Sequence, residues 1–387
     1  MIASMSAKAG LLIAATLVAT ALPASASSVP GHPEVQRVLD QAVATKIAPG
    51  IVTEIRDGRH TWFGSAGVSD TRTGRERQPQ ERFRIGSASK AFTATVLLKL
   101  AAEGKLSLDD TLDRWLPGLF DATAYQSGKI TIRQLLNQTS GIYAYTDDED
   151  FFRQGVGEEW FKHRYDTHTP EQLVKVALAH PPTNEPGQRF KYSNTNYILA
   201  AMIAEKATGK TFEQELDRTV IRPLRLTGTS LPGADPKIGG LHPVHYSVLF
   251  SSAPQPTVYD ATRMNQSFAW AAGGVISTTG DLNRFFTALL GGRVLPAAQL
   301  REMLTTVATD GSGWIPGTRY GLGIFEQKLA CGVTVWGNAG ATYGSWSYAM
   351  GTRDGRHRVA SQVNGDWASL SVFTDVLSAE FCPPTSR

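Results

Sequence analysis

The chain has 387 residues, of which 42% are hydrophobic and 19% are charged, a composition that is ordinary for a globular protein. Its formal net charge is only +3 and its basic residues are scattered, which argues against a nucleic-acid partner. A chain of this length usually exceeds what a single core holds, so we expect two subdomains.

The segment 1–26 predicts a cleaved secretory signal. Lys8 supplies a positive start, residues 10–22 an apolar stretch, and Ala24-Ser25-Ala26 a small-residue cleavage site. Because the apolar stretch is too short to span a bilayer, we expect a secreted or periplasmic protein without stable membrane insertion. An uncleaved N-terminal membrane anchor is the alternative.

The later elements follow from periodicity. Helical spacing predicts a helix over 35–46, and β-rich runs at 50–56 and 60–64 flank the hairpin turn Asp57-Gly58. Helices and loops then dominate to about residue 290, with helical spacing over 92–104, 130–136, 170–179, 197–208, 212–220 and 281–290. Strand patterns return over 322–327, 333–336, 345–350 and 357–363, and a helix over 367–381 closes the chain. The stretch 228–268 predicts no element, and loops of that length are often functional.

Strands at both ends of the chain with helices between them predict an α+β fold, in which both ends build one antiparallel sheet. We expect a sheet subdomain from residues 33–100 plus 285–383 and an inserted all-helical subdomain from residues 101–284. The active site is expected between the two.

The chain has two cysteines, Cys331 and Cys382. In an exported protein such an isolated pair indicates a disulfide, which would tie the C-terminal segment to an earlier strand. Neither cysteine has a Cys or His at metal-ligand spacing. His242 and His245 have a His-x-x-His spacing, but Pro243 argues against a regular helix there and no nearby carboxylate completes a set. We therefore expect neither a metal nor another cofactor.

The stretch Ser87-Ala88-Ser89-Lys90 opens the helical pattern that runs to Gly104. Residues three apart share a helix face, so the ammonium of Lys90 can lie beside the hydroxyl of Ser87. A lysine that is desolvated in an apolar wall loses proton affinity and can activate a serine as a nucleophile. The same four letters occur by chance in many proteins, usually as a helix cap with a solvated lysine.

Two further stretches could carry chemistry. In the polar turn Lys191 to Asn196, Tyr192 offers a phenol whose proton affinity falls beside a lysine ammonium, and Asn194 offers an amide able to hold Lys90 and a substrate carbonyl. A later strand ends at Asn338-Ala339-Gly340, where small residues let a substrate backbone pair along the strand edge. Taken alone, each stretch is most often an ordinary turn.

Together, the three stretches resemble in order and surroundings the penicillin-recognising serine hydrolases, within them the secreted D-alanyl-D-alanine carboxypeptidases and class C β-lactamase-like proteins. Supporting matches are Gly104 to Asp110, Thr131 to Leu136, Thr139-Ser140-Gly141, Asn184 to Gly187 and Gly273 to Thr278. The resemblance covers roughly residues 33–383 and implies a β-lactamase/DD-peptidase-like fold with a helical subdomain inserted into an α/β sandwich.

The resemblance also implies roles for the matching residues. Ser87 would attack a carbonyl and form an acyl-enzyme, while Lys90 and Tyr192 move its proton onto the leaving group. Asn194 would orient Lys90 and the substrate amide. Backbone N–H groups of Ser87 and Ala341 would form the oxyanion hole.

The resemblance implies roles for three more residues. Asn338 and Gly340, as part of the third motif, would help to hold and orient the substrate. Trp270, by its position before Ala271-Ala272-Gly273-Gly274, resembles an aromatic wall of the cleft, with a place in the core as the alternative.

The third motif departs from the family. It is usually Lys or His, then Thr or Ser, then Gly, and in the carboxypeptidases it helps to hold the substrate's C-terminal carboxylate together with a second hydroxyl and an arginine. Here the hydroxyl positions are Ala339 and Ala341, and Phe325 stands at the arginine position. Each lost charge-assisted bond is worth roughly 1.5–3 kcal/mol, so we expect poor activity on such substrates and on β-lactams. Another cation, for example Arg319 or Arg263, could reverse this.

The sequence therefore predicts an SxxK serine hydrolase that acts through an acyl-serine on D-amino-acid-containing peptides, amides or esters with an uncharged group at the usual carboxylate position. One alternative is a true D-alanyl-D-alanine carboxypeptidase or transpeptidase, whose partner would be a peptidoglycan stem peptide. The other is a penicillin-binding-like protein that is acylated without turnover.

Overall fold

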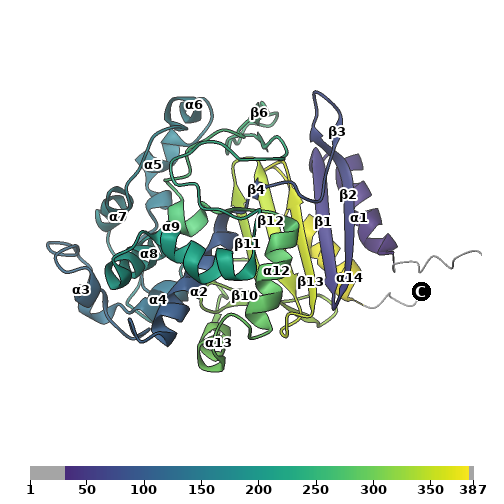
Figure 1. Cartoon of the computed structure of the whole chain (residues 1–387). Coiled ribbons are helices and arrows are strands. Elements are labelled where there is room, and N and C mark those ends of the chain that lie inside the picture. Colours follow the sequence, from purple (N-terminus) through teal and green to yellow (C-terminus); the bar gives the residue numbers. More distant parts are fainter. Residues whose placement is uncertain (1–30, 383–387) are drawn as a thin grey trace, which may run out of the picture. The chain divides into compact units, whose positions relative to one another are not determined.

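Both ends of the chain contribute strands to one large sheet (Figure 1). In this computed structural model, which describes residues 31–382, nine antiparallel strands run in the order β3-β2-β1-β13-β12-β11-β10-β9-β8. Their bounds are β1 (Gly50–Asp57), β2 (His60–Asp70), β3 (Arg75–Glu76), β8 (Val307–Ala308), β9 (Thr318–Tyr320), β10 (Phe325–Lys328), β11 (Thr334–Thr342), β12 (Ser345–Gly351) and β13 (His357–Val363). Because β1 pairs with both β2 and β13, the predicted antiparallel sheet from both chain ends is confirmed.

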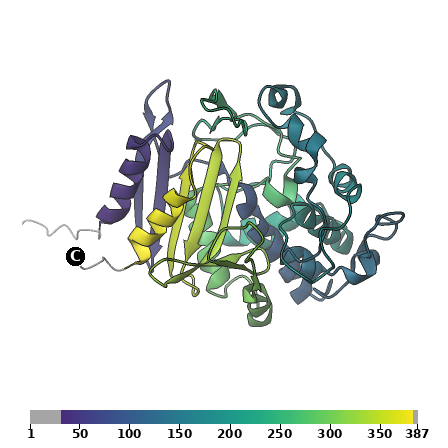
Figure 2. The same ribbon diagram turned by 180° about the vertical axis from the view of Figure 1, so that it is seen from behind.

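Helices cover both faces of this sheet. α1 (Pro33–Ala44) and α14 (Ser371–Phe381) lie side by side on the face seen in Figure 2, and α12 (Thr279–Leu290) lies on the face seen in Figure 1. The other helices are α2 (Ser89–Ala102), α3 (Leu112–Trp115), α4 (Ile132–Leu136), α5 (Glu149–Gln154), α6 (Glu159–His163), α7 (Pro170–Leu178), α8 (Thr195–Thr208), α9 (Phe212–Leu216), α10 (Arg222–Leu224), α11 (Trp270–Gly273) and α13 (Ala297–Leu304). Short strands pair β4 (Phe83–Arg84) with β7 (Ile276–Ser277), and β5 (Tyr246–Ser247) with β6 (Tyr259–Asp260).

Two helices that are buried on all sides, α2 and α8, pack against each other in the main core. Every residue from Ser89 to Leu98 and from Thr195 to Ala204 is buried. A helix without a polar face is stable only inside a core. The polar stretches that directly precede these two helices are therefore held in place by the core.

The third motif lies inside a strand. The strand predicted over 333–336 continues to Thr342, so Asn338-Ala339-Gly340 belongs to β11 and is not a turn at its end. The residues of β11 pair with β12 as far as Thr342. The small residues have little strand propensity of their own, and pairing with a buried neighbouring strand overrides that preference. The helix predicted over 367–381 likewise begins later, at Ser371.

A buried arginine holds the irregular stretch 228–268. Arg84 donates hydrogen bonds to the carbonyl oxygens of Thr262 at 2.6 Å, Pro236 at 2.9 Å and Met264 at 3.1 Å. Burial lowers the pKa of Arg84 to about 10, which leaves the side chain charged at neutral pH. The stretch is thus fixed by a cation although it contains little regular structure.

The predicted disulfide is confirmed: Cys331 and Cys382 are bonded, with their Cα atoms 5.9 Å apart. The bond joins the connection between β10 and β11 to the end of α14. A crosslink that spans 51 positions restricts the unfolded chain and so favours the folded state.

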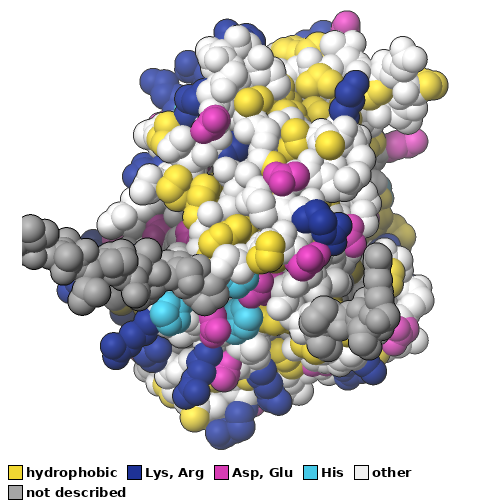
Figure 3. All heavy atoms as spheres, turned by 90° about the vertical axis from the view of Figure 1, so that its right-hand side faces the viewer, with side chains coloured by type: hydrophobic (Ala, Val, Ile, Leu, Met, Phe, Trp, Pro, Cys, Tyr) yellow, Lys and Arg dark blue, Asp and Glu magenta, His cyan; other side chains and the backbone are white. Residues whose placement is uncertain are grey.

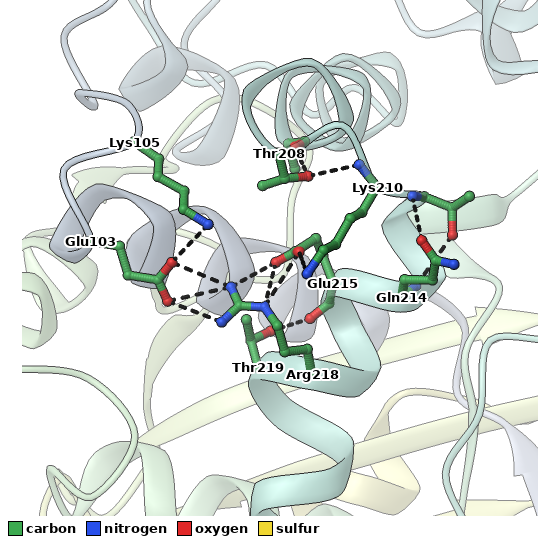
Figure 4. Close-up of polar contacts among 10 residues, drawn as sticks. Glu103, Lys105, Thr208, Lys210, Gln214, Glu215, Arg218 and Thr219 are labelled. Atoms are coloured by element: carbon green, nitrogen blue, oxygen red, sulfur yellow. Dashed lines mark hydrogen bonds and ion pairs between the residues drawn. The ribbon is translucent and has the colours of Figure 1, made fainter.

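A network of ion pairs ties α9 to the end of α2 (Figure 4). The fully buried carboxylate of Glu215 accepts a hydrogen bond from Arg218 at 2.8 Å and lies 3.7 Å from the ammonium of Lys210. Arg218 also reaches Glu103, at 3.3 Å, just beyond α2. Paired charges of this kind offset the cost of burying Glu215.

On the face seen in Figure 3, basic and acidic side chains are interspersed with neutral and apolar ones. Within residues 31–382, no helix is long and apolar enough to cross a membrane. The predicted signal segment, 1–26, lies outside the described residues. The division into a sheet subdomain and a helical subdomain stays a prediction.

Candidate active site

Ser87 lies in a single 3₁₀ turn, Gly86–Ala88, that leads directly into α2. Its neighbours in the turn are buried, whereas Ser87 is partly exposed and can be reached from solvent. Two hydroxyls of β12 hold the backbone before it: Ser345 donates to the carbonyl of Arg84 at 2.8 Å, and Ser347 donates to the carbonyl of Ile85 at 3.0 Å. Sequence reasoning missed these two serines, although polar residues two apart on an apolar strand share one face.

Lys90 is fully buried in the first turn of α2. Its ammonium can donate three hydrogen bonds, to Ser87 Oγ at 3.1 Å, to Asn194 Oδ1 at 2.7 Å and to the carbonyl of Ala272 at 2.7 Å. All three acceptors are uncharged, so burial is not offset by a counter-ion and lowers the pKa of Lys90 well below its usual value. The predicted activation of Lys90 by desolvation is therefore supported by its surroundings.

Tyr192 donates a hydrogen bond from its phenol to Ser87 Oγ at 2.7 Å. The Lys90 ammonium lies over its ring, 4.8 Å from the centroid. Burial is the largest effect on this phenol and raises its pKa well above the usual value. The prediction that a lysine ammonium would lower the proton affinity of Tyr192 is wrong, because burial of the phenol has the larger, opposite effect.

Neutral Lys90 has two protons and one lone pair. Asn194 Oδ1 and the Ala272 carbonyl, both at 2.7 Å, accept these two protons, which leaves the lone pair for the hydroxyl proton of Ser87. Asn194 is held in turn by a hydrogen bond from its amide to Thr146 Oγ1 at 3.2 Å. The geometry can therefore remove the Ser87 proton without forming a tyrosinate.

Two glycines let β11 approach the Ser87 turn. A Cβ atom on Gly86, whose φ is +52°, would lie 2.7 Å from the backbone nitrogen of Ala341. A Cβ atom on Gly340 would lie 2.4 Å from the backbone nitrogen of Ser87. Only residues without a side chain permit this contact. The N–H groups of Ser87 and Ala341 consequently belong to two closely packed backbones, as an oxyanion hole requires.

Two predicted site residues do not line the cleft. Asn338 is 2% exposed, and its amide donates to the carbonyl of Gly323 at 2.6 Å, so it braces β11 from inside instead of facing substrate. Trp270 belongs to the main core: its ring packs edge-on against Phe212 and its N–H donates to Glu213 at 2.7 Å. The prediction of Trp270 as a cleft wall is wrong, and the core alternative holds.

The positions that hold a carboxylate in the carboxypeptidases are apolar here. Ala339 and Ala341 lie two apart on β11 and are both accessible, whereas Phe325 is fully buried. Arg319 donates to Thr306 at 3.0 Å and lies 3.5 Å from Glu326, so its charge is already engaged on the sheet surface. Arg263 is exposed on the stretch 228–268.

A cavity of about 330 Å³ adjoins the site at Asn194 and Ala341. Six aromatic side chains dominate its lining, namely Phe151, Phe152, Trp160, Phe250, Phe268 and Tyr343. Asp147, beside Thr146, is an exposed carboxylate in the same lining. The same lining also contains Asp166 and Arg164, so the cavity can take a bulky apolar group beside charges of both signs.

No group of three His, Cys, Asp or Glu side chains suited to a metal ion occurs within residues 31–382. His245 is fully buried, and burial lowers its pKa well below the usual value.

Residues 35–361 match the protein family described as Beta-lactamase. This chain belongs to that family. It is a serine hydrolase, and the predicted β-lactamase-like fold is confirmed. Among solved structures, a D-stereospecific amidohydrolase from Streptomyces sp. is 46% identical, with a TM-score of 0.84 over 91% of this chain and 99% of that protein. The D-amino acid amidase from Ochrobactrum anthropi SV3, in complex with L-phenylalanine amide, is 25% identical, with a TM-score of 0.75 over 90% of this chain and 97% of that protein.

Curated relatives match over shorter stretches of the chain. Penicillin-binding protein 4* of Bacillus subtilis (strain 168) is 30% identical over 185 residues, which are 46% of this chain and 37% of that protein. Protein flp of Staphylococcus aureus (strain N315) is 26% identical over 198 residues, which are 51% of this chain and 38% of that protein. The matches thus span less than two fifths of either relative.

Proposed function

We propose that the protein hydrolyses amides and esters of D-amino acids, and peptides with an uncharged group on the leaving side, through an acyl-enzyme on Ser87. The observation that carries the proposal is the combination of a complete Ser87, Lys90, Tyr192 and Asn194 cluster with apolar residues at the carboxylate-holding positions. Similarity to a D-stereospecific amidohydrolase at 46% identity supports the D configuration.

Acylation follows from the hydrogen bonds. Neutral Lys90 takes the Ser87 proton as Oγ bonds to the substrate carbonyl carbon, and the oxyanion lies between the N–H groups of Ser87 and Ala341. The bond to the leaving nitrogen or oxygen then breaks. Tyr192 gives its proton to the leaving atom, and the proton that Lys90 took from Ser87 then passes to Tyr192, so both groups return to their neutral forms.

Deacylation uses the same residues in reverse. A water in the place of the departed group loses one proton to neutral Lys90 as it attacks the ester carbon, and Lys90 returns that proton to the Ser87 oxygen when the acid product leaves. An amine in that place would give acyl transfer in place of hydrolysis.

The aromatic cavity supports an apolar acyl group. Its volume of about 330 Å³ suits the side chain of a large D-amino acid, and Asp147 supplies a charge for a free α-ammonium. An apolar side chain gains about 25 cal/mol for each Å² that leaves water, so a large aromatic substrate is favoured over D-alanine.

We also propose that the chain is exported. The segment 1–26 has the pattern of a secretory signal, and the Cys331–Cys382 disulfide suits an oxidising compartment. N-terminal sequencing of the protein from the culture medium or periplasm would show a mature start near residue 27, whereas an intact Met1 in the cytoplasm would contradict export.

The experiment that tests the activity is intact-mass spectrometry of the mature protein and of Ser87→Ala. Each is incubated with D-phenylalanine amide, its L enantiomer, D-alanyl-D-alanine and a penicillin. We expect turnover of the D-amide alone, lost in Ser87→Ala. Efficient release of terminal D-alanine would favour a carboxypeptidase, and a stable penicillin adduct without turnover of any substrate would favour a penicillin-binding protein.

A further inference from the structure

An aromatic side chain that the reaction does not use directly lies against Tyr192. Trp314, from the connection between β8 and β9, stacks on the Tyr192 ring with centroids 4.5 Å apart and planes 18° apart. The same indole contacts Phe190 at 5.8 Å, Tyr320 at 6.0 Å and Phe325 at 6.4 Å between centroids. These five residues are called the Trp314 cluster below.

The mechanism places the leaving group beside this cluster. Tyr192 can give its proton only to an atom within hydrogen-bonding distance of its phenol. Substituents on that atom can then reach Trp314, because Trp314 stacks on the Tyr192 ring. The acyl cavity lies elsewhere, because its lining includes Asn194 and Ala341 but neither Tyr192 nor Trp314.

We propose that Trp314 is a specificity-determining residue of the leaving-group side, where it forms an apolar wall that admits uncharged leaving groups and disfavours those that carry a carboxylate. This inference rests on the proposed function and names the chemistry of its second subsite. The leaving groups that fit are ammonia, small amines, alcohols and amino-acid amides.

Desolvation is the physical reason. A carboxylate against Trp314 would exchange water for ring carbons, and a carboxylate without a partner is costly to remove from water. The residue that could supply a cation on β10 is Phe325, whose buried ring contacts Trp314, Tyr320 and Tyr348. A neutral amide or ester loses far less hydration on the same surface.

The stacked indole has a second effect, on the phenol itself. It covers part of the Tyr192 ring, and burial keeps the pKa of Tyr192 well above its usual value. A smaller side chain at position 314 would admit water beside the phenol and lower that pKa. Trp314 is therefore also a positioning residue that keeps Tyr192 a proton donor.

The test compares Trp314→Leu and Trp314→Phe with the wild type. Trp62→Leu is the matched control, since Trp62 is a partly buried tryptophan on β2, outside the Trp314 cluster. D-phenylalanyl-D-alanine amide and D-phenylalanyl-D-alanine differ only in the charge of the leaving group. We expect the wild type to prefer the amide in kcat/KM, Trp314→Leu to reduce that preference at least tenfold, and Trp314→Phe and Trp62→Leu to retain most of it.

The pH profile of kcat supplies a readout that simple loosening of the fold would not give. In Trp314→Leu the alkaline limb, which reports ionisation of Tyr192, should move to lower pH, and Trp314→Phe should restore it. An unchanged preference in folded Trp314→Leu would overturn the apolar wall, and an unchanged alkaline limb would overturn the positioning role.

A second pair of probes separates this inference from the proposed function. Benzylpenicillin carries its carboxylate on the leaving nitrogen's ring, and its methyl ester does not. Acylation of Ser87 by the two compounds, followed by intact mass, measures the same charge preference without any turnover of D-amino-acid substrates. If the D-amides are not hydrolysed, a preference for the ester that falls in Trp314→Leu would still support the wall, and equal rates in the wild type would refute it.

Discussion

Replacing Ala339 by Thr and Ala341 by Ser would restore the two hydroxyls that hold a C-terminal carboxylate in the carboxypeptidases. Both positions are accessible and lie two apart on β11, so the new side chains share one face beside the Ser87 turn. The backbone N–H of residue 341 is unaffected by the substitution. The variant therefore tests substrate selection while the groups that react with the carbonyl stay in place.

The magnitude follows from the bonds gained. A hydrogen bond to a charged group contributes about 1.5–3 kcal/mol, and about 1.4 kcal/mol corresponds to a tenfold change in rate. One new bond at the lower limit raises kcat/KM for D-phenylalanyl-D-alanine about tenfold, and two bonds at the lower limit raise it about a hundredfold. The upper limit will not be reached, because Phe325 still stands where the arginine would be and Trp314 still borders the site.

The assay is kcat/KM for the free acid and for its carboxamide, so that changes common to both substrates cancel. Ala308→Thr, an exposed alanine on β8, controls for adding a β-branched residue to the same sheet. A double variant that stays folded and keeps the wild-type ratio would refute the reasoning that the missing hydroxyls cause the preference. So would a wild type that already cleaves the acid and the carboxamide equally well.

Three further predictions concern charge. Because burial lowers the pKa of Lys90, kcat/KM should rise as the pH increases through that lowered value, and the plateau should extend to alkaline pH because the pKa of Tyr192 is raised. Between the lowered pKa of Lys90 in the folded protein and its ordinary pKa of 10.5, the unfolded chain binds more protons than the folded one. The free energy of unfolding should therefore rise with pH in this range. Lys90→Met should remove this contribution to the pH dependence of stability. Asp147→Asn should raise KM several-fold for D-phenylalanine amide but not for its N-acetyl derivative, and equal effects on both would exclude Asp147 as the partner of the α-ammonium.

The reacting cluster could be predicted from the sequence because its residues lie at or just before the starts of two mostly apolar helices that lack a continuous polar face. Such helices are stable only inside the core, and their burial also fixes the positions of their first turns. Ser87, Lys90, Tyr192 and Asn194 therefore meet as expected, at 2.7–3.1 Å. The sheet built from both chain ends could also be predicted, because strand patterns occur near both ends of the sequence.

The errors have a different origin. Whether Asn338 faces the cleft depends on the pairing of β11 with β12, which local sequence does not determine. Whether the Trp270 side chain lies in the cleft or in the core depends on how α11 packs against α9. Trp314 has no periodic signal at all, because it lies in a connection and reaches Tyr192 through contacts far apart in the sequence. The direction of the Tyr192 pKa shift required knowing that Tyr192 is itself buried, because burial is the largest effect on its pKa.

Base activation and substrate selection depend on the same lack of charge. Lys90 is a base because it is buried among neutral partners, and a carboxylate brought close to it would favour its ammonium form and raise its pKa. In the carboxypeptidases, an arginine and a cation of the third motif help to hold the substrate's carboxylate, and cations beside it offset this effect. Here Phe325 and Asn338 occupy those positions, so a carboxylate substrate that entered the site would also weaken its base. A neutral leaving group neither loses the hydration of a charge at Trp314 nor raises the pKa of Lys90. The apolar wall and the buried Lys90 therefore favour the same substrates.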